Sequence, residues 1–254
     1  MFPRRARFIG NRPRTQLIAG GRRLALSSCL LCELPTQGRI HLYPRNASGV
    51  ESQPYATKTS MQDLNITRPP SAYAALLADT RALGFDMASE VAVGALLRTL
   101  AASKPTARCL ELGTGTGLAS AWLLDGLGLH GSLVTVDNDD RLLAVARRHL
   151  GGDPRLDIRR QDGDIFLREA VGRADRFDLI FADTWSGKYR LLDETLSLLA
   201  PGGLYVIDDM LPQANWPEGH GAKVETLMAK LAQRTELRLC SLDWSCGVVL
   251  AARV

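Results

Sequence analysis

The feature that most constrains this chain is a segment in which glycine occupies every second position, Gly113-Thr-Gly-Thr-Gly117. A short strand-like run, 107–111, precedes it, and a run with the composition of a helix, 118–126, follows it. This order predicts a buried strand, a tight glycine turn and the start of a helix. Glycine lets the backbone adopt positive φ and approach a ligand closely, and free N–H groups at a helix start attract negative charge.

A second strand-like segment, Leu133-Val-Thr-Val-Asp137, ends in an acid 24 positions after Gly113. In an open α/β sheet, an acid at this place holds the ribose diol of a nucleotide cofactor. The glycine spacing is G-x-G-x-G and not the G-x-G-x-x-G of dinucleotide enzymes, because Leu118 or Ser120 stands where the third glycine would fall. Together with Glu111, the two segments favour a cofactor with a single nucleoside. A glycine-rich turn without a ligand is the alternative.

The segment Glu111-Leu-Gly-Thr-Gly-Thr-Gly117, taken with Val134-Thr-Val-Asp137, resembles the class I S-adenosylmethionine-dependent methyltransferases. Within them it is most similar to the catechol and caffeoyl-CoA O-methyltransferase group. The likeness continues through residues 177–189 and 198–209 and covers about residues 85–254. It implies a doubly wound α/β fold with a mostly parallel seven-stranded sheet. It also implies methyl transfer from S-adenosylmethionine to a small-molecule acceptor, with an oxygen as the expected target.

Strand-like and helix-like segments alternate along the chain, which predicts a parallel sheet with helices on both faces. The predicted strands are 107–111, 132–137, 155–160, 177–182, 203–207, 236–242 and 247–253. The predicted helices are 71–83, 90–102, 118–126, 139–150, 164–171, 187–199 and 217–233. Pro201-Gly-Gly203 is expected to separate a helix from a strand. The connection between the final two strands is too short for a parallel crossover, so we expect an antiparallel C-terminal strand pair.

The positive charge of the chain is concentrated before residue 61. Residues 1–60 hold ten Lys and Arg and two Asp and Glu, whereas residues 61–254 hold 21 and 25. Because residues 1–60 also show no sustained helical or strand period, we expect a disordered basic leader. A targeting peptide is one alternative. We favour another, a mis-assigned start with translation beginning at Met61, because recognisable folded sequence begins only after that residue. The methyltransferase domain is expected over residues 61–254.

The charge and the cysteines bear on partners and location. The net negative charge of residues 61–254 argues against a nucleic-acid partner, and the absence of an 18-residue apolar run argues against a membrane span. Five cysteines, an odd number without regular spacing, favour reduced thiols and a cytoplasmic location. The expected partner is a small-molecule acceptor, and a homodimer is left open.

The resemblance places several side chains around S-adenosylmethionine. Glu111 is expected near the charged tail, Asp137 at the ribose hydroxyls and Asp164 at the adenine, with Asp162 a weaker candidate there. Trp185 matches a residue that lies against the adenine in catechol enzymes, and a core tryptophan is its alternative. The full predicted cofactor set is Glu111, Gly113, Thr114, Gly115, Gly117, Asp137, Asp164, Asp183 and Trp185.

Three acids, Asp183, Asp208 and Asp209, follow two predicted strands that would end at the same sheet edge. Their oxygens suit Mg²⁺ or another divalent cation, which would lower the pKa of a bound hydroxyl. In the resembled enzymes the metal ligands match Asp183, Asp208 and the next residue, which there is usually Asn. Without a metal the acids would repel one another, and one would be protonated.

The predicted catalytic residues are Asp183, Lys188 and His220. The catalytic lysine of the catechol enzymes would fall at Ser186, which cannot do the same work, and Lys188 stands two positions on. His220, expected in a loop, is a candidate general base, with an exposed bystander as the alternative.

Two further functions stay open beside O-methyl transfer. The first is a binding protein or aminopropyltransferase-like enzyme that uses the same fold without methyl transfer. The second, ranked lower, is a dehydrogenase, which the glycine spacing disfavours.

Overall fold

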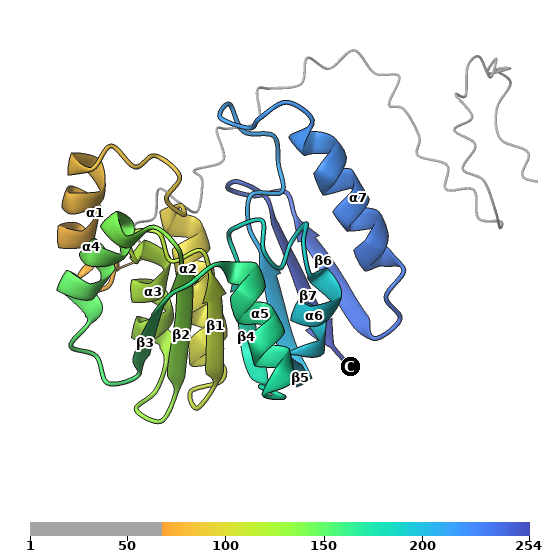
Figure 1. Cartoon of the computed structure of the whole chain (residues 1–254), viewed down its shortest axis with the longest axis horizontal. Helices are drawn as coiled ribbons and strands as arrows, with labels where there is room; N and C mark the ends of the chain where they lie inside the picture. Colours follow the sequence, from red (N-terminus) through yellow and green to blue (C-terminus); the bar gives the residue numbers. More distant parts are fainter. Residues whose placement is uncertain (1–67) are drawn as a thin grey trace, which may run out of the picture. The chain divides into compact units, whose positions relative to one another are not determined.

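The computed structural model describes residues 68–254 (Figure 1), so the expectations for residues 1–60, and residues 61–67 of the expected domain, lie outside the described part. The helices are α1 (Tyr73–Ala82), α2 (Val91–Ala102), α3 (Leu118–Gly126), α4 (Asp140–Leu150), α5 (Gly163–Gly172), α6 (Leu192–Ser197) and α7 (His220–Ala232). The strands are β1 (Arg108–Leu112), β2 (Ser132–Asp137), β3 (Leu156–Arg160), β4 (Phe177–Ala182), β5 (Leu199–Ile207), β6 (Leu237–Leu242) and β7 (Val248–Arg253).

The seven strands form one sheet in the order β3-β2-β1-β4-β5-β7-β6. The pairs from β3 through β5 are parallel, and β7 pairs antiparallel with both β5 and β6. The mostly parallel sheet with an antiparallel C-terminal pair that the sequence predicted is therefore confirmed. β7 lies between β5 and β6, so β6 and β3 are the two edge strands.

Helices cover both faces of the sheet. Successive side chains of a strand point to opposite faces, so apolar residues of one strand can contribute to a core on each side. In β1, Cys109 belongs to a core with α1–α4, whereas Leu110 and Leu112 belong to a second core with α5–α7. Figure 1 shows the two groups of helices on opposite sides of the strands. Sandwiched between them, β1 and β4 are almost wholly buried and hold the centre of the sheet fixed.

The region after β4 differs from the sequence prediction. The helix expected over 187–199 is reduced to α6, because Gly187 (φ 86°) and Leu191 (φ 54°) adopt left-handed conformations that a helix cannot contain. Residues 185–190 instead form a turn that carries Lys188. β5 begins at Leu199, and Pro201-Gly-Gly203 lies within it at a shift in register against β4, so it does not separate helix from strand.

The helix expected over 217–233 begins later, at His220, after Gly219 adopts a left-handed conformation with φ 76°. His220 is therefore the first residue of α7 and not a loop residue. Within residues 68–254, no helix has the length and apolar character needed to cross a membrane.

Candidate active site

A cavity of about 550 Å³ lies at the edge of the sheet where the parallel strands end. Asp137 ends β2, Asp183 follows β4 and Asp208 follows β5, and all three line this cavity. Open α/β sheets bind ligands in this position, at the point where the strand order reverses beside β1. Residues 85–90 and the segment from Gln213 to His220 supply part of the remaining wall.

The glycine turn after β1 lines the cavity from Gly113 to Thr116. Gly113 has φ 100°, and a Cβ there would stand 2.7 Å from the backbone oxygen of Asp183. Only glycine can therefore let the turn pass this closely over the end of β4. Gly117 shares the left-handed backbone but does not line the cavity, because it packs against α4.

The Asp137 carboxylate is held in place by two backbone N–H groups. Gly115 N donates to Oδ2 at 2.9 Å, and Asp139 N donates to Oδ1 at 2.9 Å. Since each carboxylate oxygen can accept two hydrogen bonds, both oxygens retain acceptor capacity toward the cavity. This arrangement suits a ligand that presents two neighbouring hydroxyls.

Glu111 does not line the cavity. It is buried beneath the glycine turn, where Ser120 and Thr135 both donate to its Oε2. Within residues 68–254 its Oε1 has no hydrogen-bond partner. Burial raises the pKa of Glu111 to about 7, although the two hydroxyl donors oppose the rise.

Asp164 also lies outside the cavity wall. It accepts a hydrogen bond from Ser186 at 2.6 Å and pairs with Arg190 at 2.7 Å. Asp162 caps α5 by accepting from the backbone N–H groups of Asp164 and Ile165. The structure therefore engages both acids within the fold, and neither faces the cavity in this arrangement.

An aromatic cluster forms another part of the cavity wall. The His220 ring lies 4.4 Å from the Trp216 ring at 37° and 5.3 Å from the Tyr189 ring at 87°. Trp185, which lines the cavity and is 40% exposed, contacts both Tyr189 and His220 edge-on. His220 is therefore not an exposed residue, because its side chain is only 5% exposed and lies within this cluster.

His220 has one partner for two ring nitrogens. Nε2 lies 3.0 Å from the Tyr189 hydroxyl, whereas Nδ1 is buried and has no partner in the described part of the chain. Burial lowers the pKa of His220. The negative charge of Asp209 opposes this shift, and the positive charges of Lys188 and Lys223 add to it. The imidazole is therefore suited to be neutral near pH 7 and to accept a proton.

The three predicted metal ligands all line the cavity but are already engaged. Ser89 donates to Asp183 at 3.0 Å, Cys246 and the backbone N–H of Asp209 donate to one oxygen of Asp208, and Trp216 donates to Asp209 at 3.0 Å. Asp209 also has a left-handed backbone with φ 60°. Among residues 68–254, no group of three His, Cys, Asp or Glu side chains is arranged to hold a metal ion. The acids as placed do not fit a divalent cation.

Burial raises the pKa of Asp183 well above its ordinary value, and the neighbouring charge of Asp208 raises it further. Burial likewise raises the pKa of Asp208, against the Cys246 hydrogen bond that lowers it. In both cases the Lys188 ammonium opposes the rise. Ser186 stands where the catalytic lysine of the catechol enzymes would fall. Its hydroxyl contacts Asp164 and Arg190.

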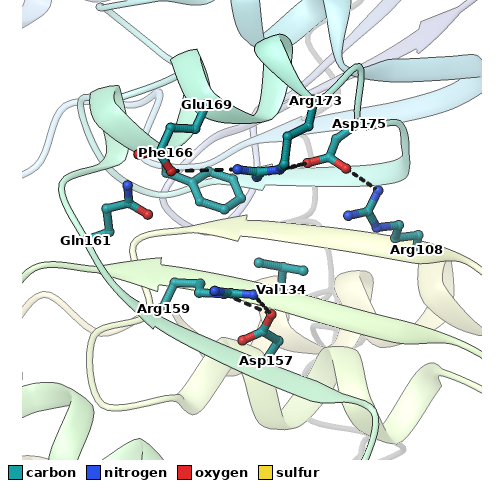
Figure 2. A pocket seen from close by; sticks show the side chains of 9 residues that line it. All are labelled: Arg108, Val134, Asp157, Arg159, Gln161, Phe166, Glu169, Arg173 and Asp175. Carbon is teal, nitrogen blue, oxygen red and sulfur yellow. Dashed lines mark hydrogen bonds and ion pairs between the residues drawn. The ribbon is translucent and has the colours of Figure 1, made fainter.

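A second cavity, of about 290 Å³, shares no lining residue with the cavity at the strand ends (Figure 2). Its charged side chains neutralise one another: Arg108 and Arg173 both pair with Asp175, and Arg159 pairs with Asp157. Neither the glycine turn nor the aromatic cluster contributes to it. The cavity at the strand ends is therefore the better candidate for catalysis.

Several residues of the wall were not singled out from the sequence. Asn138 and Leu142 extend the cavity beyond Asp137, while Ser89 and Cys246 reach its acids. Asn138 could have been found, because it directly follows the acid at the end of β2. Ser89 and Cys246 carry no local signal, since they reach the cavity only through contacts between distant segments.

Comparisons with known proteins agree with this geometry. A family model described as a methyltransferase domain matches residues 110–210. The catechol O-methyltransferase of Niastella koreensis is 31% identical over 146 residues, or 54% of this chain and 66% of that protein. The matches span from 53% to 66% of the length of the curated relatives, so the chain aligns with only part of each.

Two solved structures share the fold. The O-methyltransferase from Bacillus cereus, in complex with SAH, has a TM-score of 0.67 and 19% identity over 76% of this chain and 95% of that chain. The O-methyltransferase TomG from Streptomyces achromogenes, in complex with SAM, has a TM-score of 0.66 and 22% identity over 76% and 94%. The family match runs from within β1 to the acids after β5, which is the part of the sheet that builds the cavity. Residues 110–210 are thus similar to a methyltransferase domain, and the chain shares the fold of these solved O-methyltransferases.

Proposed function

We propose that this protein transfers a methyl group from S-adenosylmethionine to an oxygen of a small-molecule acceptor. The observation that carries the proposal is the shared cavity, because the fixed Asp137 carboxylate and the Tyr189–His220 pair line the same space. One wall offers a place for a nucleoside, and the other offers a proton acceptor among aromatic rings. The solved relatives with SAM or SAH bound support the same cofactor.

The cofactor would be held by the glycine turn and by Asp137. Gly113 and Gly115 leave room at the places where a Cβ would contact Asp183 or Phe85. Asp137 would accept the two ribose hydroxyls, and Trp185, partly exposed at the wall, would cover the base. When bound, S-adenosylmethionine supplies an electrophilic methyl group on a positively charged sulfur.

The acceptor hydroxyl must lose its proton as its oxygen attacks. We assign that proton to His220, whose lowered pKa keeps the ring neutral and whose Nδ1 has no partner within the described residues. Tyr189 holds the other ring nitrogen and fixes the orientation of the imidazole. Of the other two predicted catalytic residues, Asp183 is the second candidate for the base, since its raised pKa favours proton uptake by the carboxylate.

The divalent cation expected from the sequence stays a prediction. Because the engaged acids do not fit it, we write the reaction without a metal, and methyl transfer should persist in EDTA. Loss of activity in EDTA that Mg²⁺ restores would reinstate the metal. We further propose that the acceptor is a small molecule and not a nucleic acid, and that the protein is cytoplasmic. Whether it forms a homodimer is left open.

The test is a screen of hydroxylated acceptors with S-adenosylmethionine labelled in its methyl group, read by transfer of label. Mass spectrometry of ligands that copurify with the protein separates the alternatives. S-adenosylmethionine or its demethylated product supports methyl transfer. A decarboxylated analogue would favour the aminopropyltransferase-like function, and a nicotinamide cofactor would favour a dehydrogenase.

A further inference from the structure

Lys188 is a lysine buried in the wall of the cavity. It is 4% exposed, and Nζ donates to the backbone oxygen of Asp208 at 2.7 Å. Nζ also lies 5.8 Å from the centre of the Tyr189 ring. Lysine is among the residues least often buried unless an opposite charge compensates it. The position therefore calls for a counter-charge nearby.

Asp183 and Asp208 supply that counter-charge. Both line the cavity beside Lys188, and the positive charge of the ammonium lowers the pKa of each carboxyl against the effect of burial. None of the ion pairs within residues 68–254 joins Lys188 directly to a carboxylate. The ammonium donates to a backbone oxygen and forms no ion pair with either acid. Its charge therefore lowers the pKa of both carboxyls.

The backbone explains how Lys188 reaches this place. Gly187 has φ 86°, and a Cβ there would stand 2.6 Å from Leu112 Cδ1, so the turn is pressed against the end of β1. The Tyr205 hydroxyl donates to the backbone oxygen of Gly187 at 2.6 Å from β5. The turn is thus fixed on two strands, and it directs Lys188 toward the acids that follow β4 and β5.

A divalent cation in this cluster would meet two obstacles. It could bind only one oxygen of each acid without displacing a donor, because Ser89, Cys246 and Trp216 already donate to the other oxygen. It would also lie close to the Lys188 charge, and like charges repel strongly in a site with little water.

We propose that the Lys188 ammonium is the resident cation of the Asp183–Asp208 pair and excludes a divalent metal ion from it. This charge balance does not depend on methyl transfer. Its consequence for catalysis does rest on the proposed function: an ammonium beside the acceptor would stabilise the negative charge that develops on the attacking oxygen.

Binding of Mn²⁺ to the full-length protein tests the proposal without any turnover. The loss of the free-ion signal in electron paramagnetic resonance reports binding. We expect wild type and Lys188→Arg, which keeps the charge, to bind Mn²⁺ weakly. We expect Lys188→Gln and Lys188→Met to bind it at least about tenfold more tightly, because the competing charge is gone. Adding Asp183→Asn to Lys188→Gln should remove the gain.

Two results would overturn the proposal. One is tight, stoichiometric Mn²⁺ binding by the wild type that Asp183→Asn abolishes. The other is a folded Lys188→Gln or Lys188→Met variant, confirmed by a cooperative melt, that binds Mn²⁺ no better than the wild type. If neither variant folds, the wild-type titration decides alone, with weak binding in support. A protein that follows the expected pattern but transfers no methyl group would refute the proposed function and leave this inference standing.

Discussion

The Tyr189 hydroxyl and Nε2 of His220 lie 3.0 Å apart in the wall of the cavity. The two residues come from different elements, the turn after β4 and the first turn of α7, so the fold itself brings them together. The contact fixes the imidazole and leaves Nδ1, which is buried and has no partner within residues 68–254, as the nitrogen that would have to meet an acceptor.

We expect His220→Asn to lower kcat by roughly 10²–10⁴-fold, the usual range for loss of a general base. The affinity for S-adenosylmethionine should change little, because the hydrogen bonds that hold Asp137 do not involve His220. In the wild type, kcat should fall as the pH drops through the lowered pKa of His220, because protonation removes the base. Steady-state kinetics across pH measure both effects. His130→Asn, an exposed histidine, is the matched control, and an unchanged kcat in His220→Asn would exclude the role.

Asp137→Ala should weaken binding of S-adenosylmethionine by more than about tenfold, because hydrogen bonds to a charged group contribute about 1.5–3 kcal/mol each. Isothermal titration calorimetry measures the loss. Asp157→Ala serves as the control, since that acid lines the second cavity and pairs with Arg159. If Asp157→Ala weakened binding and Asp137→Ala did not, the cofactor would belong in the second cavity.

Glu111 should make stability depend on pH. Its folded-state pKa of about 7 lies above the ordinary value of 4.5, so between these values the unfolded chain ionises while the native state stays protonated. The free energy of unfolding should therefore fall with rising pH, by about 3 kcal/mol across that window. Glu111→Gln cannot ionise, so its free energy of unfolding should not show this fall with rising pH. Chemical denaturation at several pH values measures it, and identical pH profiles for the two proteins would contradict it.

Gly113→Ala should destabilise the fold by roughly 1–3 kcal/mol, because it forces a side chain into a left-handed backbone and against the Asp183 oxygen. Gly152→Ala is the matched control: no heavy atom lies within 4 Å of a Cβ there, and its φ is not in the left-handed range. That change should have little effect or stabilise by up to about 1 kcal/mol. Thermal melts compare the two, and equal shifts would disprove the close approach.

The sheet and the acids at its edge could be predicted because local patterns determine them. Asp137 and Asp183 each follow an apolar strand, and parallel strands end at one edge whatever the rest of the fold does. Glu111 shows the limit of this reasoning. An acid within a strand can face either side, and Glu111 is held under the turn by contacts with Ser120 of α3 and Thr135 of β2, which a strand pattern does not specify.

The places of Lys188 and His220 could not be predicted for a different reason. Each depends on a backbone reversal, at Gly187 and Gly219, that ends or delays a helix the composition favours. The reversal at Gly187 is stabilised by contacts with β1 and β5, and the sequence pattern carries no information about those contacts. The sequence therefore identified the chemistry of these side chains but not their partners.

The position of β7 between β5 and β6 constrains the order in which the sheet can be completed as the chain is synthesised. β6 leaves the exit tunnel first but has no neighbour in the sheet until β7 arrives, because β6 bonds only to β7. Cys246 and Gly247, which contact Asp208 and the backbone beyond β5, emerge just ahead of β7. The parallel half of the sheet can thus assemble during synthesis, whereas the ligand cavity closes only after residue 247. Cofactor capture by nascent chains of increasing length would then report a late, single step of completion.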